Sequence, residues 1–245
     1  MSFQERIAVI TGAAVGIGRA VAVKLAAEGA RVAALDLNAE GLESLRQEVS
    51  SAGGVLHPFL CDVSKEEEVN RVFSQIKETL GKVDILVNNA ALWRCHSTFL
   101  DTPVADWERF FDVNVMGVVY CTRAALPAML QSGYGRIVNV ASVAGVYGNA
   151  KMVHYSATKG AILSMTKALA KEVAEHGVTV NSVSPGTVTS SEENDLTLTA
   201  PSEVNYMKRT GSDMENAELI CFLASDKAAY ISGQNVQIDG CRKKI

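Results

Sequence analysis

Cysteine is scarce in this chain, and its distribution excludes two kinds of stabilised small domain. The five cysteines are odd in number, scattered along 245 residues and without a Cys-x-x-Cys pair. Disulfide frameworks and structural zinc sites need paired or closely spaced cysteines. The pattern argues against both, and no cluster of His, Cys and Asp indicates a metal. It fits a reducing compartment, so we expect a cytoplasmic protein.

Long apolar runs and basic tracts are also missing. No apolar run approaches the roughly 18 residues that span a bilayer. Residues 1–6 lack the basic region and cleavage site of a signal peptide. There is no Lys/Arg block or aromatic–basic interleaving, and the net charge is −4. We therefore expect neither a membrane nor a nucleic acid as a partner.

What the chain has in quantity is apolar sequence, with 48% hydrophobic against 20% charged residues. Short β-branched runs alternate with helix-like segments, which predicts an α/β fold: a doubly wound parallel sheet of seven strands with helices on both faces. No repeat or linker divides the 245 residues, so we expect one domain. The expected strands are 7–10, 31–37, 55–60, 83–87, 135–140, 178–183 and 235–238; the expected helices are 19–28, 39–51, 65–80, 102–130, 152–174 and 215–224.

Three details of this reading concern loops and helix ends. Ser64 followed by Glu67 predicts a capped start for the helix 65–80. A loop with Gly145 and Gly148 is expected before the helix 152–174. The polar segment about 187–212 shows no strong period and predicts a mobile lid.

A glycine-rich turn lies between the first expected strand and the first expected helix. Gly12, Gly16 and Gly18 follow the spacing Gly-x-x-x-Gly-x-Gly, with Val15 and Ile17 between them. Glycines let the backbone approach a phosphate closely, and a helix N-terminus offers free N–H groups and partial positive charge. This combination favours a dinucleotide-binding turn.

An acidic residue, Asp36, ends the second expected strand. In a βαβ dinucleotide unit, an acid at this place binds the adenosine ribose hydroxyls. It would repel the 2′-phosphate of NADP, and neither Val15 nor Leu37 offers a cation to neutralise that phosphate. The sequence therefore predicts NAD as the preferred cofactor.

Tyr155 and Lys159 are four residues apart in an expected helix, so their side chains lie on one face. A phenol has a pKa of about 10 and is a poor base near neutral pH. An ammonium about 4 Å away contributes roughly 4 kcal/mol at an effective dielectric of about 20. That would lower the phenol pKa by about three units. The pair is then suited to proton exchange with a carbonyl or alcohol oxygen.

Taken together, these motifs resemble those of the short-chain dehydrogenases/reductases, over about residues 4–240. The motifs that carry the resemblance are Thr11-Gly12-x-x-x-Gly16-x-Gly18, Asp62-Val63, Asn88-Asn89-Ala90, Asn114, Ser142, Tyr155-x-x-x-Lys159 and Pro185-Gly186. The resemblance implies a single-domain Rossmann fold and an oxidoreductase that uses a nicotinamide dinucleotide, commonly as a homotetramer or homodimer.

The resemblance also implies roles for four residues in catalysis. Tyr155 would be the general acid/base, and Lys159 would bind the nicotinamide ribose and hold down the Tyr155 pKa. Ser142 would orient the substrate oxygen. Asn114 would hold a water that links Lys159 to solvent.

The remaining implied positions bind the cofactor: the glycine turn cradles the pyrophosphate, Asp62 and Val63 flank the adenine, and Pro185, Gly186 and Val188 face the nicotinamide. The full expected set is Gly12, Val15, Gly16, Ile17, Gly18, Asp36, Leu37, Asp62, Val63, Asn89, Ala90, Ala91, Tyr155, Lys159, Pro185, Gly186, Val188 and Ser190.

The chain departs from the family pattern at three positions. Ala91 stands where Gly is usual, Ser190 where Thr is common, and Cys241 where Gly is common. None of these changes removes a catalytic group. They concern the shape of the cleft and the behaviour of the lid.

Substrate selection is expected to depend on Ser142, Trp93, Arg94, Tyr147 and Met152. Arg94 could meet an anionic substrate, but an ordinary exposed loop is the favoured explanation. His154 is expected to be a surface residue at a helix start, because neighbouring helix residues point in different directions.

The leading hypothesis is an NAD-dependent enzyme that interconverts a small-molecule secondary alcohol and its ketone. One alternative is a 3-oxoacyl-(acyl-carrier-protein) reductase; such enzymes usually prefer NADPH, which Asp36 disfavours. Another is a non-catalytic dinucleotide-binding sensor or scaffold, which would need none of Asn114, Ser142, Tyr155 and Lys159.

Overall fold

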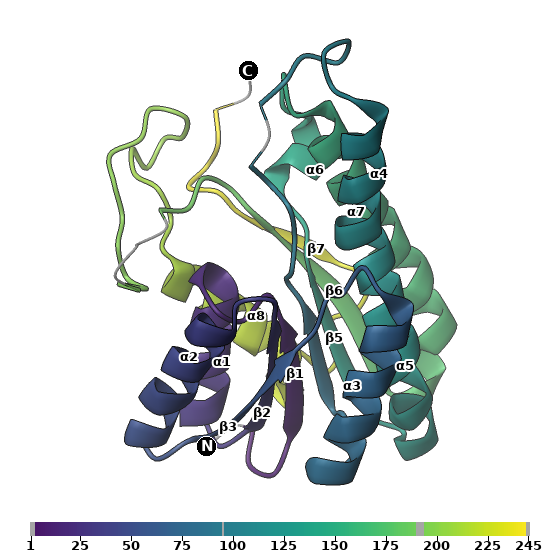
Figure 1. Ribbon diagram of the computed structural model, residues 1–245. Coiled ribbons are helices and arrows are strands. Elements are labelled where there is room, and N and C mark those ends of the chain that lie inside the picture. The colour runs from purple at the N-terminus through teal and green to yellow at the C-terminus, as the bar shows by residue number, and fades with distance from the viewer. Residues whose placement is uncertain (1–2, 95, 190–193, 244–245) are drawn as a thin grey trace.

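The computed structural model describes residues 3–94, 96–189 and 194–243, and its central feature is one seven-stranded parallel sheet (Figure 1). The strand order is β3-β2-β1-β4-β5-β6-β7, and every strand pair is parallel. The predicted α/β fold class is confirmed. The strands are β1 (Ile7–Thr11), β2 (Arg31–Asp36), β3 (Val55–Leu60), β4 (Ile85–Asn88), β5 (Gly135–Val140), β6 (Val178–Pro185) and β7 (Asn235–Ile238).

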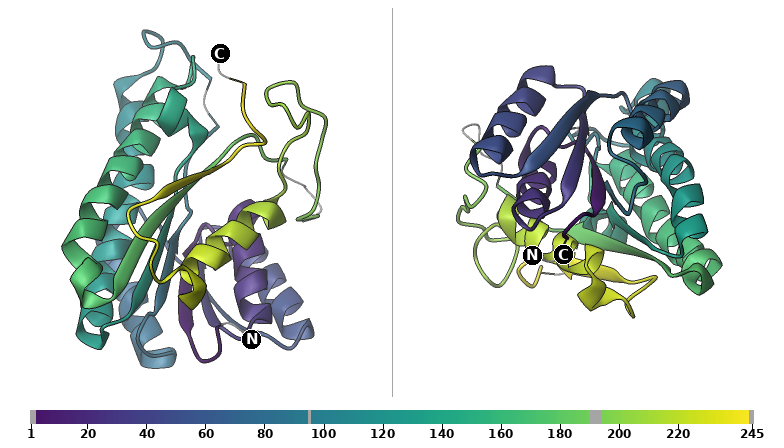
Figure 2. Two further views of the ribbon diagram at one scale, coloured as in Figure 1. Left: turned by 180° about the vertical axis from the view of Figure 1, so that it is seen from behind. Right: turned by 90° about the horizontal axis from the view of Figure 1, so that it is seen from below.

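Helices cover both faces of this sheet (Figures 1 and 2). One face carries α1 (Gly16–Ala27), α2 (Ala39–Ser51) and α8 (Asp213–Ala224). The other carries α3 (Glu66–Thr79), α5 (Gly117–Ser132) and α7 (Val153–Val173). The other helical elements are α4 (Val104–Phe111), α6 (Val143–Tyr147), the π-helical turn η1 (Asp112–Met116) and the 3₁₀ turns η2 (Ala174–His176) and η3 (Asp226–Ala228).

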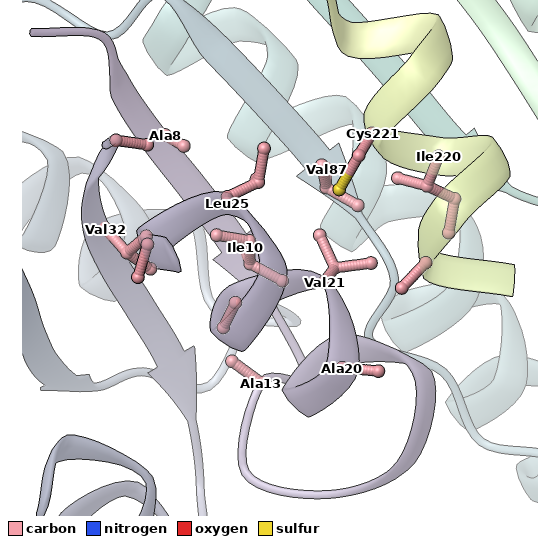
Figure 3. Packing of buried hydrophobic residues seen from close by; sticks show 14 of the residues in the cluster. Ala8, Ile10, Ala13, Ala20, Val21, Leu25, Val32, Val87, Ile220 and Cys221 are labelled. Carbon is pink, nitrogen blue, oxygen red and sulfur yellow. The ribbon is translucent and has the colours of Figure 1, made fainter. Parts of the chain in front are cut away.

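Each face of the sheet packs its own apolar core. On the first face, Val21 and Leu25 of α1 lie in one cluster with Val87 of β4 and with Ile220 and Cys221 of α8 (Figure 3). All five side chains are at most 2% exposed. Because strands buried on both faces need apolar residues at successive positions, the continuous apolar runs in the sequence identify the central strands.

The structure corrects two details of the sequence reading. The N-cap of α3 is Lys65, and it makes no side-chain cap, so the predicted cap at Ser64 is wrong. The Ser64 hydroxyl instead donates to Asp62 Oδ1 at 2.7 Å. The expected loop before α7 contains the short helix α6, whose first turn is capped by the Ser142 hydroxyl accepting from the Ala144 N–H.

The helical run Val104–Ser132 is long and apolar enough to cross a membrane, by length and composition only, with a mean hydropathy of 1.3 over 18 residues. The sequence analysis did not predict this run, because polar residues interrupt it. In the fold, α5 packs against α3, β4 and β5. This is the position of a helix that covers a sheet.

From β1 the chain adds β2 and β3 on one side, and it then returns to place β4 on the other side of β1. In open α/β sheets, ligands bind beyond the carboxyl ends of the strands at such a switch point. A ligand is therefore expected at the loops that follow β1 and β4.

Candidate active site

A cleft of about 1040 Å³ opens beyond the carboxyl ends of the six strands β1 to β6. Most residues predicted to bind cofactor or substrate line it, although they come from segments far apart in the sequence. The predicted residues on its wall are Gly12, Val15, Gly16, Ile17, Asp36, Leu37, Asp62, Val63, Asn89, Ala90, Ala91, Trp93, Ser142, Met152, Tyr155, Lys159, Pro185, Gly186 and Val188.

The glycine turn is packed so tightly that two of its positions have no room for a side chain. A Cβ on Gly18 would lie 2.0 Å from the Gly12 carbonyl oxygen. Gly12 has φ +65°, and a Cβ there would lie 2.8 Å from Ala90 Cα. The Asn89 side-chain amide donates to the carbonyls of Thr11 and Gly12, at 3.0 Å each, and so fixes the turn.

The first turn of α1 follows the glycine turn directly and is suited to an anion. Its N-cap, Val15, supplies no side-chain hydrogen bond to the first N–H groups. Free N–H groups and the helix dipole at such a position attract anions, including pyrophosphates. Gly18, which is buried, lies behind the cleft wall and not on it.

Asp36 is held by two backbone hydrogen bonds. Its Oδ2 accepts from the Ala14 N–H and its Oδ1 from the Asn38 N–H, both at 3.0 Å. Each carboxylate oxygen keeps a further lone pair for a hydroxyl group. The sequence reasoning missed Lys65, a cation on the wall of the same cleft.

Lys159 lies in the floor of the cleft, one helical turn from Tyr155 on α7. It is 3% exposed, and its Nζ donates to the Val140 carbonyl at 2.7 Å. The same nitrogen is 5.8 Å from the centroid of the Tyr155 ring. Burial lowers the pKa of Lys159 to about 8. The lysine is therefore an ammonium at neutral pH, at a cost to folding.

This cost leads to a prediction for Lys159→Met. A pKa lowered from 10.5 to about 8 corresponds to roughly 3 kcal/mol at neutral pH. Losing the hydrogen bond to Val140 offsets about 1 kcal/mol of this. We expect the variant to be more stable at pH 7 by about 2 kcal/mol, measured by urea unfolding.

The stability difference between Lys159→Met and wild type should also depend on pH. The wild-type lysine becomes neutral in the folded protein as pH rises through 8, so the advantage of the variant should shrink between pH 8 and 10.5. The matched control is Lys167→Met, an exposed lysine on the same helix, with an expected change within about 0.5 kcal/mol. Equal effects of the two substitutions would contradict the account.

Ser142 stands at the end of β5, on the cleft wall with Tyr155 and Lys159. Its Oγ accepts from the Ala144 N–H at 3.1 Å, which fixes its rotamer at the start of α6. The hydroxyl hydrogen remains to be donated to a ligand oxygen. Because α6 packs against α7, this contact sets the position of Ser142 relative to Tyr155.

Asn114 lies behind the cleft wall, in η1, and is 1% exposed. Its Oδ1 accepts from the Leu92 N–H at 2.7 Å, and its Nδ2 donates to the Leu92 carbonyl at 2.9 Å and to Thr158 Oγ1 at 3.1 Å. The side chain thus joins the loop after β4 to α7. Its predicted role in holding a water stays a prediction.

Several residues proposed from the sequence lie elsewhere. Arg94 stacks on Trp93, with its guanidinium carbon 5.2 Å from the ring centroid, and is not on the cleft wall. The Tyr147 hydroxyl donates to Gln237 Oε1 at 2.6 Å, which turns it toward β7. Ser190 lies outside the described residues.

His154 is not the surface residue that the sequence suggested. It is 1% exposed, with its ring centroid 4.4 Å from Phe110 and 5.7 Å from Trp107. The prediction was wrong because it considered α7 alone and not α4, which covers this face of it. Within the described part of the chain, neither ring nitrogen has a hydrogen-bond partner.

The segment expected to be a lid begins shortly after β6 ends at Pro185. Its described residues, 187–189 and 194–212, form neither a helix nor one of the seven strands. It pairs with the C-terminal segment: the Tyr206 N–H donates to the Cys241 carbonyl at 3.0 Å, and the Met207 N–H donates to the Gly240 carbonyl at 3.2 Å. Its mobility stays a prediction.

Sequence reasoning also missed Asp213, which lines the cleft close to Gly16. The expected start of the last helix, at residue 215, left Asp213 in the preceding loop. Ser212, which caps α8 together with Glu215, is the signal that could have placed it in the first turn.

Comparison with known proteins identifies the family that the sequence motifs resemble. The family model described as short chain dehydrogenase matches residues 6–199. The chain is 36% identical to a 3-oxoacyl-(acyl-carrier-protein) reductase of Thermotoga maritima, over 98% of each chain. It is 37% identical to 2-dehydro-3-deoxy-L-rhamnonate dehydrogenase (NAD+) of a Sphingomonas species, over 98% of this chain and 96% of the relative.

Proposed function

The chain belongs to the short-chain dehydrogenase family and is an oxidoreductase, and we propose that it interconverts a secondary alcohol and a ketone with NAD. The observation that carries this proposal is the cleft that joins Asp36, the glycine turn, Ser142 and the Tyr155–Lys159 pair. The predicted family is confirmed; the cofactor preference and the residue roles are our proposals.

A nicotinamide dinucleotide suits the residues present. The glycine turn leaves no room for side chains at Gly12 and Gly18, and the open N–H groups of α1 would hold the pyrophosphate. Asp36 would accept hydrogen bonds from the adenosine ribose. Asp62, Val63, Pro185, Gly186 and Val188 would complete the wall. When bound, the nicotinamide supplies or accepts the hydride.

Tyr155, Ser142 and Lys159 would handle the proton. The Tyr155 phenolate oxygen would take the proton from a substrate alcohol, and in the reverse direction the phenol hydroxyl would give its proton to a ketone oxygen. Ser142 donates a hydrogen bond that orients the same oxygen. The buried Lys159 ammonium stabilises negative charge on the phenol oxygen, more strongly than it could in water.

We expect NADH to bind at least about tenfold more tightly than NADPH, because the Asp36 carboxylate would face the 2′-phosphate. Asp36→Asn should reduce this preference chiefly by improving NADPH binding, since the amide keeps an acceptor oxygen without the charge. Quenching of tryptophan fluorescence measures both affinities, with Trp93 on the cleft wall as a reporter.

Glu78→Gln is the control for this comparison, since it removes an exposed charge from α3. The control should leave both affinities unchanged. Tighter binding of NADPH by the wild-type protein would overturn the NAD assignment, and Lys65 would then be the first cation to test.

The substrate class has two candidates that the relatives' names support. One relative is named for a carrier-protein-linked 3-oxoacyl group and another for a sugar acid. A screen of secondary alcohols with NAD+, together with reduction of a 3-oxoacyl thioester by NADH, decides between them through absorbance of the reduced nicotinamide. No turnover of either class with either cofactor would contradict the proposed reaction.

We also infer a cytoplasmic enzyme that assembles as a homotetramer or homodimer. Buried free thiols at Cys61, Cys121 and Cys221 fit a reducing compartment. The exposed apolar side chains Val104 and Phe111 on α4 favour a covered helix face. Sedimentation of the purified protein tests the assembly.

A further inference from the structure

Asp213 is a buried acid at the mouth of the glycine turn. It is the first residue of α8, follows the N-cap Ser212 and is 3% exposed. It lines the cleft, and its Oδ1 is 3.6 Å from the place that a Cβ on Gly16 would occupy. The carboxyl group thus faces the turn that is proposed to hold the pyrophosphate.

Among the described residues, the carboxyl group of Asp213 is unpaired. Within the ranges that the structure describes, no side chain or backbone group forms a hydrogen bond or ion pair with it. Glu215, two residues further along the same helix, pairs with Arg209, and Arg19 of α1 pairs with Glu48. Burial raises the pKa of Asp213 to about 6. The dipole of α8 accounts for an acid in its first turn, but leaves unexplained its position in the cleft.

An anion bound at the glycine turn would change the ionisation of Asp213. A carboxylate beside a pyrophosphate is repelled, whereas a carboxylic acid can donate its hydrogen to a phosphate oxygen. We propose that Asp213 sets the pH dependence of dinucleotide binding, because the cofactor is bound tightly when this carboxyl group is neutral and weakly when it is ionised. This inference rests on the proposed function.

The sign follows from linkage. A bound pyrophosphate favours the neutral acid, so binding takes up a proton wherever the free protein has an ionised Asp213. Affinity should therefore fall as pH rises from about 6. The other charged or titratable groups on the cleft wall are Asp36, Cys61, Asp62, Lys65, Glu108, Arg109, Asp112, Tyr155 and Lys159, and a matched variant must separate Asp213 from them.

The test measures the dissociation constant of ADP-ribose from pH 5.5 to 8.5 by calorimetry. ADP-ribose carries the pyrophosphate without the nicotinamide. If a bound pyrophosphate raises the pKa of Asp213 by one unit, wild-type affinity falls by up to about tenfold over this range. Asp213→Asn should remove that fall and bind more tightly than wild type at pH 8.5.

Two further variants make the outcome decisive. Glu218→Gln removes an exposed charge from the same helix and should keep the wild-type profile. Asp213→Ser replaces the Asn variant if the latter does not fold. Binding with the same pH profile in wild type and in the Asp213 variants, or a flat wild-type profile, overturns this inference alone. Failure of ADP-ribose and NADH to bind at any pH overturns the proposed function as well.

Discussion

Replacing Tyr155 by Phe is expected to lower kcat by about 10²–10⁴-fold, the range that general acid–base catalysis supplies. The substitution removes one hydroxyl and leaves the ring in place near Lys159, whose Nζ is 5.8 Å from the ring centroid. The glycine turn and Asp36 lie at the other end of the cleft from Tyr155. The affinity for NADH should therefore change by less than about threefold, which corresponds to well under 1 kcal/mol.

Tyr147→Phe is the matched control, because Tyr147 is a half-exposed tyrosine that contacts Gln237 and not the cleft. It should keep wild-type turnover. The measurement is steady-state absorbance of NADH with the best alcohol from the screen, together with fluorescence titration of NADH. Unchanged turnover in the Tyr155 variant would reject its role as the acid/base, whereas lost NADH binding would point to a structural defect.

Features that depend on short stretches of chain could be predicted from the sequence. The glycine turn, Asp36 and the Tyr155–Lys159 spacing are set by local periodicity and by their positions after strands. The parallel sheet then brings the strand ends to one edge, so these segments meet in one cleft. The alternation of apolar runs and helices was sufficient for this part of the fold.

Features that depend on packing between distant elements could not be predicted in the same way. The burial of His154 follows from α4 lying over α7. The burial of Lys159 lowers its own pKa, an effect that the sequence reasoning left out when it considered only the phenol. Asp213 enters the cleft because α8 packs on α1.

The short helix α6 shows how a missed element can matter for chemistry. It looked like a loop because it has five residues and contains Gly145. A Cβ on Gly145 would lie 2.6 Å from the backbone carbonyl carbon of Lys159 and 2.8 Å from the Gly160 nitrogen. The glycine therefore lets α6, which Ser142 caps, pack closely against the backbone of α7 at Lys159.

Gly145→Ala is accordingly expected to separate the reacting groups without changing any of them. The new methyl group must push α6 away from α7, because the atoms that it meets are backbone atoms. Ser142, which caps α6, moves with it relative to Tyr155. A displacement of about 1 Å at a reacting centre can cost about 10²-fold in rate, so we expect kcat to fall by about that factor.

Gly160→Ala provides a matched comparison from the other side of the same contact. Its Cβ would lie 3.6 Å from the Gly145 carbonyl oxygen, an ordinary van der Waals distance, and alanine favours the helix. Turnover should stay within roughly twofold of wild type. Affinity for ADP, which lacks the ribose assigned to Lys159, should be unchanged in both variants. Full activity in Gly145→Ala would mean that the separation between α6 and α7 does not control how Ser142 and Tyr155 act on the substrate oxygen.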